Sequence, residues 1–380
     1  MLRILITGGA GFIGSHTADA LIQQGHQVRV LDLLDPQVHP RGVERPAYLH
    51  PEVKLLRGDV RRSSDVAAAL EGIDVVYHFA ALTGVGQSMY DLRSYVDTNT
   101  TGTATLLEGI IKRKSPLQKL VVSSSRAVYG EGTGSCQTCG VERFAGTRRR
   151  QDLEAGCWDV VCPVCGDALR PVPTRETRPL SPISVYGLTK RHQEDLCLQV
   201  SESFRLPTVC LRYFNVYGSR QSLKNPYTGV VSIFFSRIVA GQPIHLYEGG
   251  SAGRDFVHVS DVVRANLLAL EDHVPSGSVI NVGTGQRCTI GEVAGALGRA
   301  TQRNPCLVDS GEYRMGDVRD CYADLQLART TLQYEPKVSL EQGMREFSAW
   351  AATQPSIDLY QRTVEELRQH DLLGARKRDG

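Results

Sequence analysis

The stretch that decides the fold is Leu2-Arg3-Ile4-Leu5-Ile6-Thr7-Gly8-Gly9-Ala10-Gly11-Phe12-Ile13-Gly14, followed further on by Val28-Arg29-Val30-Leu31-Asp32. Its first apolar run predicts a buried strand, and the glycines that follow predict a tight turn. Residues 15–24 have the pattern of an amphipathic helix, and residues 28–32 that of a second strand. Glycine alone would be weak evidence, because turns collect it for conformational reasons. Strand, glycine turn, helix and strand in this order predict a dinucleotide-binding unit.

The turn and the acid that ends the second strand together indicate which dinucleotide binds. Small residues let backbone N–H groups approach a pyrophosphate, and the helix N-terminus favours negative charge. Asp32 is placed to accept hydrogen bonds from the adenosine ribose, and its charge would repel a 2′-phosphate. We therefore predict NAD rather than NADP, bound by Gly8, Gly11, Phe12, Ile13, Gly14 and Asp32.

Composition sets broad limits on what the protein is. The 380 residues are 41% hydrophobic and 22% charged, which is enough apolar material for one large or two modest domains. A net charge of +2 points neither to nucleic acid nor to an acidic substrate. No secretory signal and no apolar run of about 20 residues stands in the sequence, so we expect a cytoplasmic protein with no membrane partner.

Strand and helix patterns alternate through the first half of the chain, which predicts an α/β fold with a parallel, doubly wound Rossmann sheet. The binding crevice of such a sheet lies at the carboxyl ends of its strands. We expect an NAD-binding domain over 1–216 with an insertion at 131–178, a smaller substrate-binding domain over 217–350, and a helical tail over 351–380. Within the tail, 357–376 is expected to form a solvated outer helix. The further strands are predicted at 53–57, 75–79, 120–122 and 208–214, and the helices at 63–70, 91–112 and 185–204.

Three residues form a candidate catalytic group. Ser125 ends a predicted strand, and Tyr186 and Lys190 stand four residues apart at the start of a predicted helix. Side chains at i and i+4 share one helix face, so phenol and ammonium can point into the same crevice. A tyrosine acting as a base near pH 7 needs its pKa lowered by about 3 units, and a nearby ammonium favours the phenolate. Ser125 can hydrogen-bond the same substrate oxygen. The alternative is a surface helix that carries Tyr and Lys by chance.

With these motifs the chain resembles the extended short-chain dehydrogenase/reductase family, specifically the NAD-dependent sugar-nucleotide epimerases and dehydratases. The resemblance also rests on Gly58-Asp59-Val60, His78-Phe79-Ala80-Ala81, Arg212 to Gly218, Arg254 to Val259 and Arg314-x-Gly316-Asp317. It implies cofactor contacts from Asp59, Val60, Phe79, Ala80, Ala81, Asn99, Tyr186 and Lys190. It implies that Asn215, Arg254 and Arg314 hold the diphosphate of a nucleotide-sugar substrate, and that two copies pair through 91–112 and 185–204.

The residues after Ser125 distinguish between reactions of this family. Dehydratases carry an Asp-Glu pair there, whereas this chain has Arg126 and Ala127, so elimination lacks its acid and base. The resemblance then implies an isomerase that epimerises C4 through a transient 4-keto sugar. Among the epimerases, 85–90, 225–230 and 313–319 are most similar to dTDP-L-rhamnose 4-epimerases, and Thr83 stands where UDP-glucose 4-epimerases usually carry Lys. A UDP-glucose or UDP-hexuronate 4-epimerase, a dehydratase and a non-catalytic NAD sensor remain alternatives.

The insertion carries two Cys-x-x-Cys pairs, Cys136 with Cys139 and Cys162 with Cys165. Thiolates two residues apart can hold one side of a tetrahedral ion, so the pattern predicts a zinc-ribbon-like module with a structural zinc site. Disulfides or a loop without metal are the alternatives. Between the pairs, Arg148-Arg149-Arg150 is expected to be a solvated run, with contact to nucleic acid or a partner as the weaker interpretation.

Overall fold

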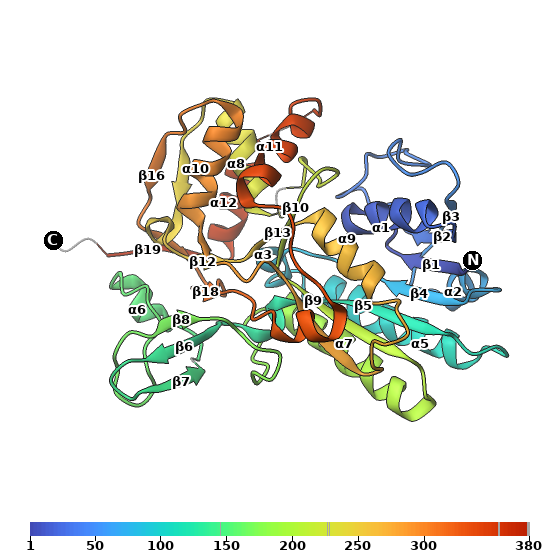
Figure 1. The fold of residues 1–380 in the computed structure, drawn as a ribbon. Helices are drawn as coiled ribbons and strands as arrows, with labels where there is room; N and C mark the ends of the chain where they lie inside the picture. Colours follow the sequence, from blue (N-terminus) through green and yellow to red (C-terminus); the bar gives the residue numbers. More distant parts are fainter. Residues whose placement is uncertain (145, 226, 228, 356–357, 378–380) are drawn as a thin grey trace.

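A seven-stranded parallel sheet forms the centre of the molecule (Figure 1). The computed structural model describes residues 1–144, 146–225, 227, 229–355 and 358–377, so Pro226 and Thr228 of the 225–230 motif lie outside the described residues. The strands predicted from the sequence are confirmed as members of this sheet. Its order is β14 (Ser278–Val282), β9 (Thr208–Tyr213), β5 (Lys119–Ser125), β4 (Val75–His78), β1 (Arg3–Thr7), β2 (Gln27–Asp32) and β3 (Lys54–Arg57).

Each face of the sheet is covered by helices, as a doubly wound fold requires. Successive side chains of a strand point to opposite faces, so Ile4 and Ile6 join one core while Leu5 joins the other. The first core is closed by α1 (Phe12–Gln23) and α9 (Val259–Leu268), which pack together. The second is closed by α2 (Ser63–Leu70), α5 (Gly102–Ile111) and α7 (Val185–Phe204).

The helix predicted over 91–112 exists in three connected pieces. These are α4 (Leu92–Tyr95), the π-helical segment η1 (Val96–Thr101) and α5. A π-helical turn adds a residue and re-aims the side chains within it, and such turns are frequent at functional sites. Here the wide turn contains Asn99, which is fully buried.

The segment 217–350 is divided between two parts of the molecule. Its α9 and β14 complete the Rossmann layer, while α8 (Val230–Val239), α10 (Ile290–Thr301) and α11 (Leu340–Ala351) enclose a separate apolar core. A boundary at 216 therefore describes the smaller domain only in part, because the chain returns to the large sheet before it ends the smaller domain.

The tail forms the expected outer helix over only part of its length, and that helix is not fully solvated. It contains α12 (Tyr360–Gln369), whose Val364 and Leu367 are buried, and the strand β19 (Leu373–Ala375). This strand pairs antiparallel with β17 (Glu312–Arg314), so that Arg314 stands opposite Leu373. The prediction was wrong because the apolar residues of a polar segment found partners far away in the sequence.

The insertion forms a small unit at one end of the molecule (Figure 1). Its three-stranded antiparallel sheet has the order β7 (Val141–Phe144), β6 (Thr133–Cys136), β8 (Arg170–Val172), and α6 (Arg150–Glu154) follows β7. β6 begins a few residues after the end of β5, so the insertion grows directly out of the strand end that carries Ser125. Within the described ranges, no helix has the length and apolar character needed to cross a membrane.

Candidate active site

The glycine turn between β1 and α1 is packed so tightly that two of its glycines have no room for a side chain. Gly8 has φ of +69°, and a Cβ there would lie 2.7 Å from the backbone nitrogen of Ala80. A Cβ on Gly14 would lie 2.6 Å from the carbonyl oxygen of Gly8. Gly11 differs, since its Cβ would meet only that same oxygen, at 3.3 Å. The first and third glycines thus serve packing, and the middle one leaves open space over the helix N-terminus.

Asp32 at the end of β2 is held in place by the same turn. Its Oδ2 accepts a hydrogen bond from the Ala10 N–H at 2.9 Å, and its Oδ1 accepts one from the Leu34 N–H at 2.9 Å. Burial raises the pKa of Asp32, while these N–H groups and the nearby His39 act in the opposite direction. An acidic side chain fixed beside a glycine turn is the arrangement that a ribose of NAD requires, so these residues fit the predicted cofactor.

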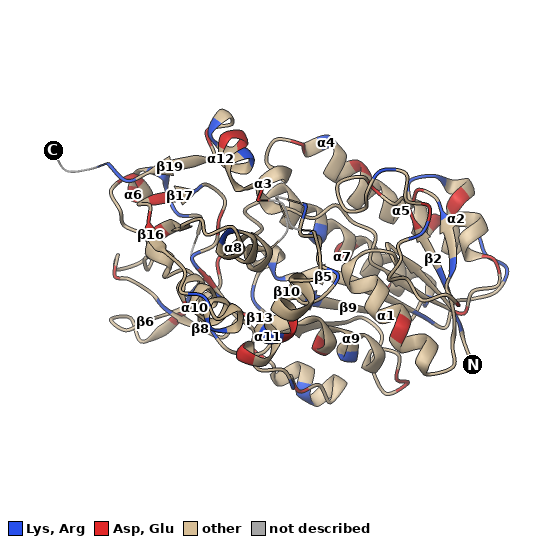
Figure 2. Ribbon diagram, turned by 90° about the horizontal axis from the view of Figure 1, so that it is seen from above, with Lys and Arg blue, Asp and Glu red and all other residues tan. Residues whose placement is uncertain are grey.

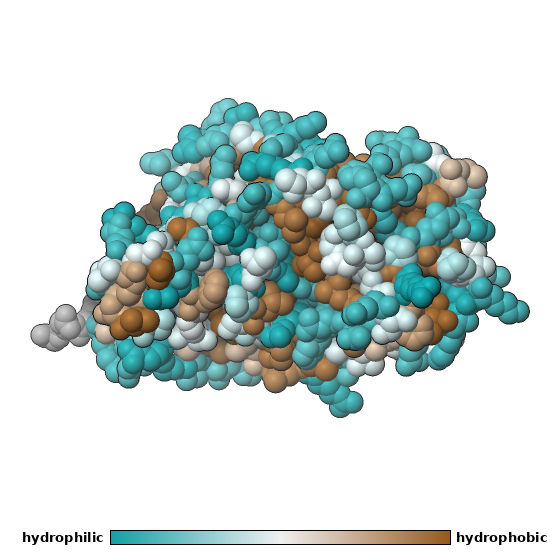
Figure 3. Space-filling model, turned by 60° about the horizontal axis from the view of Figure 1, so that its bottom comes forward, coloured by the Kyte–Doolittle hydropathy of each residue, from teal (hydrophilic) through white to brown (hydrophobic). Residues whose placement is uncertain are grey.

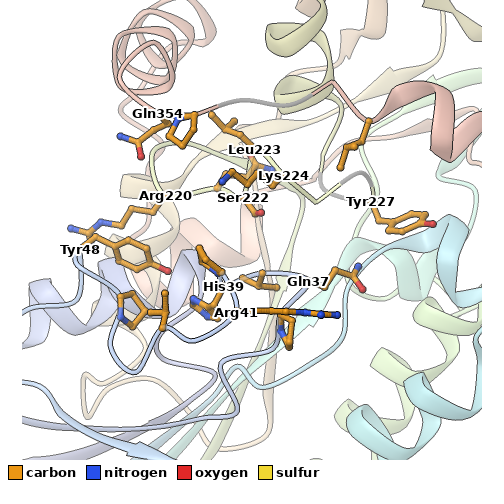
Figure 4. A pocket seen from close by; sticks show the side chains of 18 of the residues that line it. Gln37, His39, Arg41, Tyr48, Arg220, Ser222, Leu223, Lys224, Tyr227 and Gln354 are labelled. Atoms are coloured by element: carbon orange, nitrogen blue, oxygen red, sulfur yellow. The ribbon is translucent and has the colours of Figure 1, made fainter.

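Most of the predicted site residues line one cavity of about 640 Å³. It runs over the carboxyl ends of β1, β2, β4 and β5, as the crevice rule for parallel sheets predicts. A second, larger cavity of about 1420 Å³ adjoins it between the 36–48 loop and the C-terminal segment (Figure 4). The predicted residues in the smaller cavity are Gly8, Gly11, Phe12, Ile13, Gly14, Asp32, Asp59, Val60, Phe79, Ala80, Ala81, Ser125, Tyr186, Lys190 and Asn215.

Asn99, predicted as a cofactor contact, lies behind the cavity wall instead. Its Oδ1 accepts the Leu82 N–H at 2.7 Å, and its Nδ2 donates to the Thr189 Oγ1 at 2.9 Å. The side chain therefore ties the loop after β4 to the helix that carries Tyr186 and Lys190. Its amide groups are used within the protein.

Local hydrogen bonds fix the start of α7, where the predicted tyrosine stands. Ser184 caps the helix by accepting the Gly187 N–H at 3.1 Å, and the Ser88 Oγ accepts the Tyr186 N–H at 3.0 Å. Ser125 occupies the end of β5 and accepts the Ala127 N–H at 3.2 Å. Strand end and helix start thus bring the Ser125 hydroxyl and the Tyr186 phenol together.

The electrostatics around the phenol differ from the simple picture of a lysine beside a tyrosine. Burial raises the pKa of Tyr186, while a hydrogen bond with Ser125 and the positive charge of Arg126 oppose that rise. Lys190 is 3% exposed and donates to the carbonyl oxygen of Ser123 at 2.7 Å. Burial lowers the pKa of Lys190 to about 7. Arg126 is therefore a positive charge that favours the phenolate, a role that the sequence analysis did not assign to it.

Arg254 and Arg314 lie outside the smaller cavity, joined by one carboxylate. The Asp317 carboxylate forms two ion pairs, one from its Oδ1 to the Arg254 Nη2 at 2.9 Å and one from its Oδ2 to the Arg314 Nη2 at 2.9 Å. Burial would raise the pKa of Asp317, but Arg314, Arg254, Arg126 and Arg148 hold it well below its usual value. Arg148 is also paired with Glu248 and Glu131, which leaves Arg126, Arg254 and Arg314 to share Asp317. The buried Arg314 Nε has no hydrogen-bond partner among the described residues. Such a cluster suits a diphosphate, which accepts charge-assisted hydrogen bonds from guanidinium groups.

The four predicted metal ligands come together in the insertion. All four are free thiols whose Sγ atoms lie within 4.8 Å of one another. The Cys136 and Cys165 Sγ atoms are 3.4 Å apart, and those of Cys139 and Cys162 are 3.9 Å apart. Four thiolates around one zinc ion would be separated by about 3.8 Å, from a Zn–S distance near 2.3 Å. The residues therefore fit a tetrahedral ion.

Arg148 is buried, and the sequence reasoning placed it wrongly. It was expected in a solvated run, yet its side chain is buried and lies in an ion pair with Glu248 at 2.7 Å. Arg149 beside it is exposed, as expected. The run itself gives no signal that separates the two, because the acid that receives Arg148 is 100 residues away. Elsewhere, positive and negative residues alternate along the ribbon in Figure 2.

Comparison with known proteins agrees with the geometry. The model of the NAD dependent epimerase/dehydratase family matches residues 4–149 and 162–283. The dTDP-L-rhamnose 4-epimerase of Burkholderia thailandensis is 36% identical over 92% of this chain and 95% of its own length.

Solved structures give the same result. The UDP-glucose 4-epimerase of Thermotoga maritima, with UDP-glucose, has a TM-score of 0.75 and 31% identity, over 92% of this chain and 99% of its own. The UDP-glucuronic acid 4-epimerase of Bacillus cereus, in complex with UDP-glucuronic acid and NAD, has a TM-score of 0.74 and 28% identity, over 92% and 99%. Family model, relatives and glycine turn agree, and the chain therefore belongs to the NAD-dependent epimerase/dehydratase family.

Proposed function

We propose that the protein is a sugar-nucleotide 4-epimerase that uses tightly held NAD. The observation that carries this proposal is the meeting of Ser125 and Tyr186 at the wall of the cavity formed by the glycine turn. Next to Ser125 stand Arg126 and Ala127, so the acid and base that an elimination needs are missing at these positions. The groups present can move one hydroxyl proton, and that is all the protein itself must do in an epimerisation.

The reaction follows from the roles of these side chains. Tyr186 takes the proton of the C4 hydroxyl, and Ser125 hydrogen-bonds the same oxygen as it becomes a carbonyl. Bound NAD would supply the hydride chemistry, as acceptor from C4 and then as donor to the opposite face of the same carbon. Between the two transfers the 4-keto sugar turns over, held by its diphosphate at Arg254 and Arg314, and Tyr186 then gives the proton back to the oxygen. The sugar leaves with inverted configuration at C4 and no net oxidation.

For the substrate we propose dTDP-L-rhamnose. This rests on the relative that is 36% identical over nearly the whole chain and on the motifs at 85–90 and 313–319. A UDP-glucose or UDP-glucuronate epimerase is the second candidate, favoured by the solved structures with those ligands.

Incubation with each sugar nucleotide tests the reaction. Purified protein is mixed with dTDP-L-rhamnose, UDP-glucose or UDP-glucuronate, and the C4 epimer is detected by NMR of the anomeric proton. We expect conversion of dTDP-L-rhamnose, which should be absent in Tyr186→Phe although that variant retains bound NAD. Conversion of a UDP-sugar alone would replace the substrate but keep the reaction. Bound NAD without turnover of any of the three would indicate the sensor instead.

For the four cysteines we propose a structural zinc ion, because four thiolates leave no open coordination position. The Cys139 N–H donates to the Cys136 Sγ at 3.4 Å, and hydrogen bonds of this kind orient the ligands of a metal. Mass spectrometry of metal content tests the site. One zinc per chain is expected in the wild type and in Cys157→Ser, whose exposed thiol lies outside the cluster, and none in Cys162→Ser. Equal zinc in both variants would contradict it.

We also propose that two copies pair through α7 and the segment 91–112, whose pieces α4, η1 and α5 pack beside α7. Leu92, Val96 and Leu188 on these elements are exposed apolar side chains. The lower side of the molecule in Figure 1, which carries α5 and α7, is brought forward in Figure 3 and shows apolar groups between hydrophilic ones. Light scattering should give a dimer for the wild type and for Val164→Arg in the insertion, and a monomer for Leu188→Arg. A monomeric wild type would refute the pairing.

A further inference from the structure

The insertion reaches from its four cysteines to the arginines proposed to hold the substrate. Within the described part of 135–170, the buried residues are two of the cysteines, Leu153 and Arg148. A segment with so few buried apolar side chains gains little stability from a core of its own. Its order must come from the metal site and from the surface on which it docks.

Arg148 makes several of the contacts of this docking. Its Nη1 donates to the Glu248 Oε2 at 2.7 Å and to the carbonyl oxygen of Trp158 at 3.0 Å, and its Nε lies 3.2 Å from the Glu131 Oε1. Its Nη2 donates to the carbonyl oxygen of Asp317 at 3.0 Å. One guanidinium therefore joins the insertion, the strand end after Ser125 and the substrate-binding part of the chain.

The contact with Asp317 connects this network to the proposed diphosphate site. Arg148 fixes the backbone of Asp317, whose carboxylate is shared between Arg254 and Arg314. Movement of that backbone would move the carboxylate, and with it the two guanidinium groups. The planar fork of an arginine fixes such geometry better than a single ammonium can.

Two further contacts join the insertion to the segment 313–319, which carries Arg314 and Asp317. The ring of Trp158 packs against Tyr313, the residue before Arg314, with ring centres 6.2 Å apart. Asp159 pairs with Arg319 at 2.9 Å. Arg148, Trp158 and Asp159 all lie in the stretch between Cys139 and Cys162, so the predicted metal site clamps both ends of the segment that supplies these contacts.

We infer that the metal-bound insertion is a working part of the substrate site, and that Arg148 is a positioning residue for Arg254 and Arg314. This rests on the proposed function in taking a nucleoside diphosphate as the group bound at Arg254 and Arg314, and on the proposed zinc ion in taking a metal at the four cysteines. The metal itself does not touch the substrate. It holds the segment that presents Arg148, so that metal loading and diphosphate affinity are coupled while the NAD cavity is not.

Calorimetry with dTDP and with UDP tests the inference on the NAD-loaded protein, without any need for turnover. We expect at least a tenfold weaker Kd in Arg148→Met, an intermediate loss in Arg148→Lys, and no change in Arg149→Met, the exposed neighbour. NAD content should be equal in all four proteins, which shows that each has folded. Removal of zinc from the wild type by a chelator should weaken dTDP binding by a similar factor, and readdition should restore it.

Turnover gives a second readout that a merely stabilising residue would not move. With the substrate that the wild type converts, Arg148→Met should raise KM at least tenfold and change kcat less than threefold. Unchanged Kd values in Arg148→Met, unchanged binding after zinc removal, or no binding of either nucleotide by the wild type would each overturn the inference. Failure of every epimerase assay with the binding differences intact would refute the proposed reaction alone.

Discussion

Replacement of Gly11 by alanine should separate the stability of the protein from its affinity for NAD. Gly11 has φ of −74° and ψ of −177°, which any residue adopts. The added Cβ would meet only the Gly8 carbonyl oxygen, at 3.3 Å, so a shift of a few tenths of an ångström relieves the contact. Because alanine also restricts the unfolded chain by about 0.4–1 kcal/mol, the NAD-free protein should be as stable as the wild type or slightly more.

The affinity for NAD should fall sharply in the same variant. Gly11 lines the cavity, and its missing side chain leaves room where the backbone must approach the pyrophosphate. A methyl group there would lengthen at least one N–H to phosphate hydrogen bond. Hydrogen bonds to charged groups contribute about 1.5–3 kcal/mol, so the Kd should rise about 10- to 150-fold.

Urea denaturation of the NAD-free protein and calorimetry with NAD measure the two effects separately. Gly8→Ala should lose both, because φ is +69° and its Cβ would lie 2.7 Å from the Ala80 nitrogen. Gly25→Ala is the opposite control, since its φ of +80° is strained but nothing lies within 4 Å. It should lose about 1 kcal/mol of stability and keep its affinity. Binding of NAD by Gly11→Ala within twofold of the wild type would refute the close approach.

Three other changes have defined outcomes. Tyr186→Phe should lower kcat by about 10²- to 10⁴-fold, and Ser125→Ala should lower kcat less, while both variants keep their bound NAD. Stopped-flow and steady-state rates measure this, and a Tyr186→Phe variant with the wild-type rate would contradict the mechanism. Burial lowers the pKa of His78 to about 3, below its usual value near 6.5, so the unfolded state binds the extra proton as the pH falls from 6.5 toward 3 and stability is lost. The loss in the free energy of unfolding amounts to about 2 kcal/mol between pH 6.5 and 5. Over this pH range the urea midpoint of the wild type should fall more steeply than that of His78→Gln. Equal slopes against pH would mean that another group titrates. Asp32→Asn should shift the ratio of NADP to NAD affinity at least tenfold toward NADP, because the carboxylate that repels a 2′-phosphate is gone, and an unchanged ratio by calorimetry would exclude that role.

Local order in the sequence was enough to predict the cofactor half of the molecule. β1, the glycine turn, α1 and β2 follow one another within the first 32 residues, and β1 pairs directly with β2, although β1 also pairs with β4 and α1 packs on α9. The two Cys-x-x-Cys pairs could also be recognised in the sequence as candidate metal ligands, because the two cysteines of a pair are brought together by a single tight turn. Where residues contact neighbours in the chain, spacing alone carries the information.

What the tertiary structure decided depends on partners far apart in the chain. Arg148 and Arg149 look alike in the sequence, but only Arg148 meets Glu248 and the backbone of Asp317. Arg254 and Arg314 share one carboxylate, and β19 covers the strand that carries Arg314. Burial of a charge requires a matching charge at the same place, and a sequence pattern gives no distance between residues 100 or more positions apart. The sequence therefore determined the sheet, the glycine turn and the candidate residues Ser125, Tyr186, Arg254 and Arg314, and only the packed chain decided that Arg148 is buried and reaches the backbone of Asp317 between the two arginines.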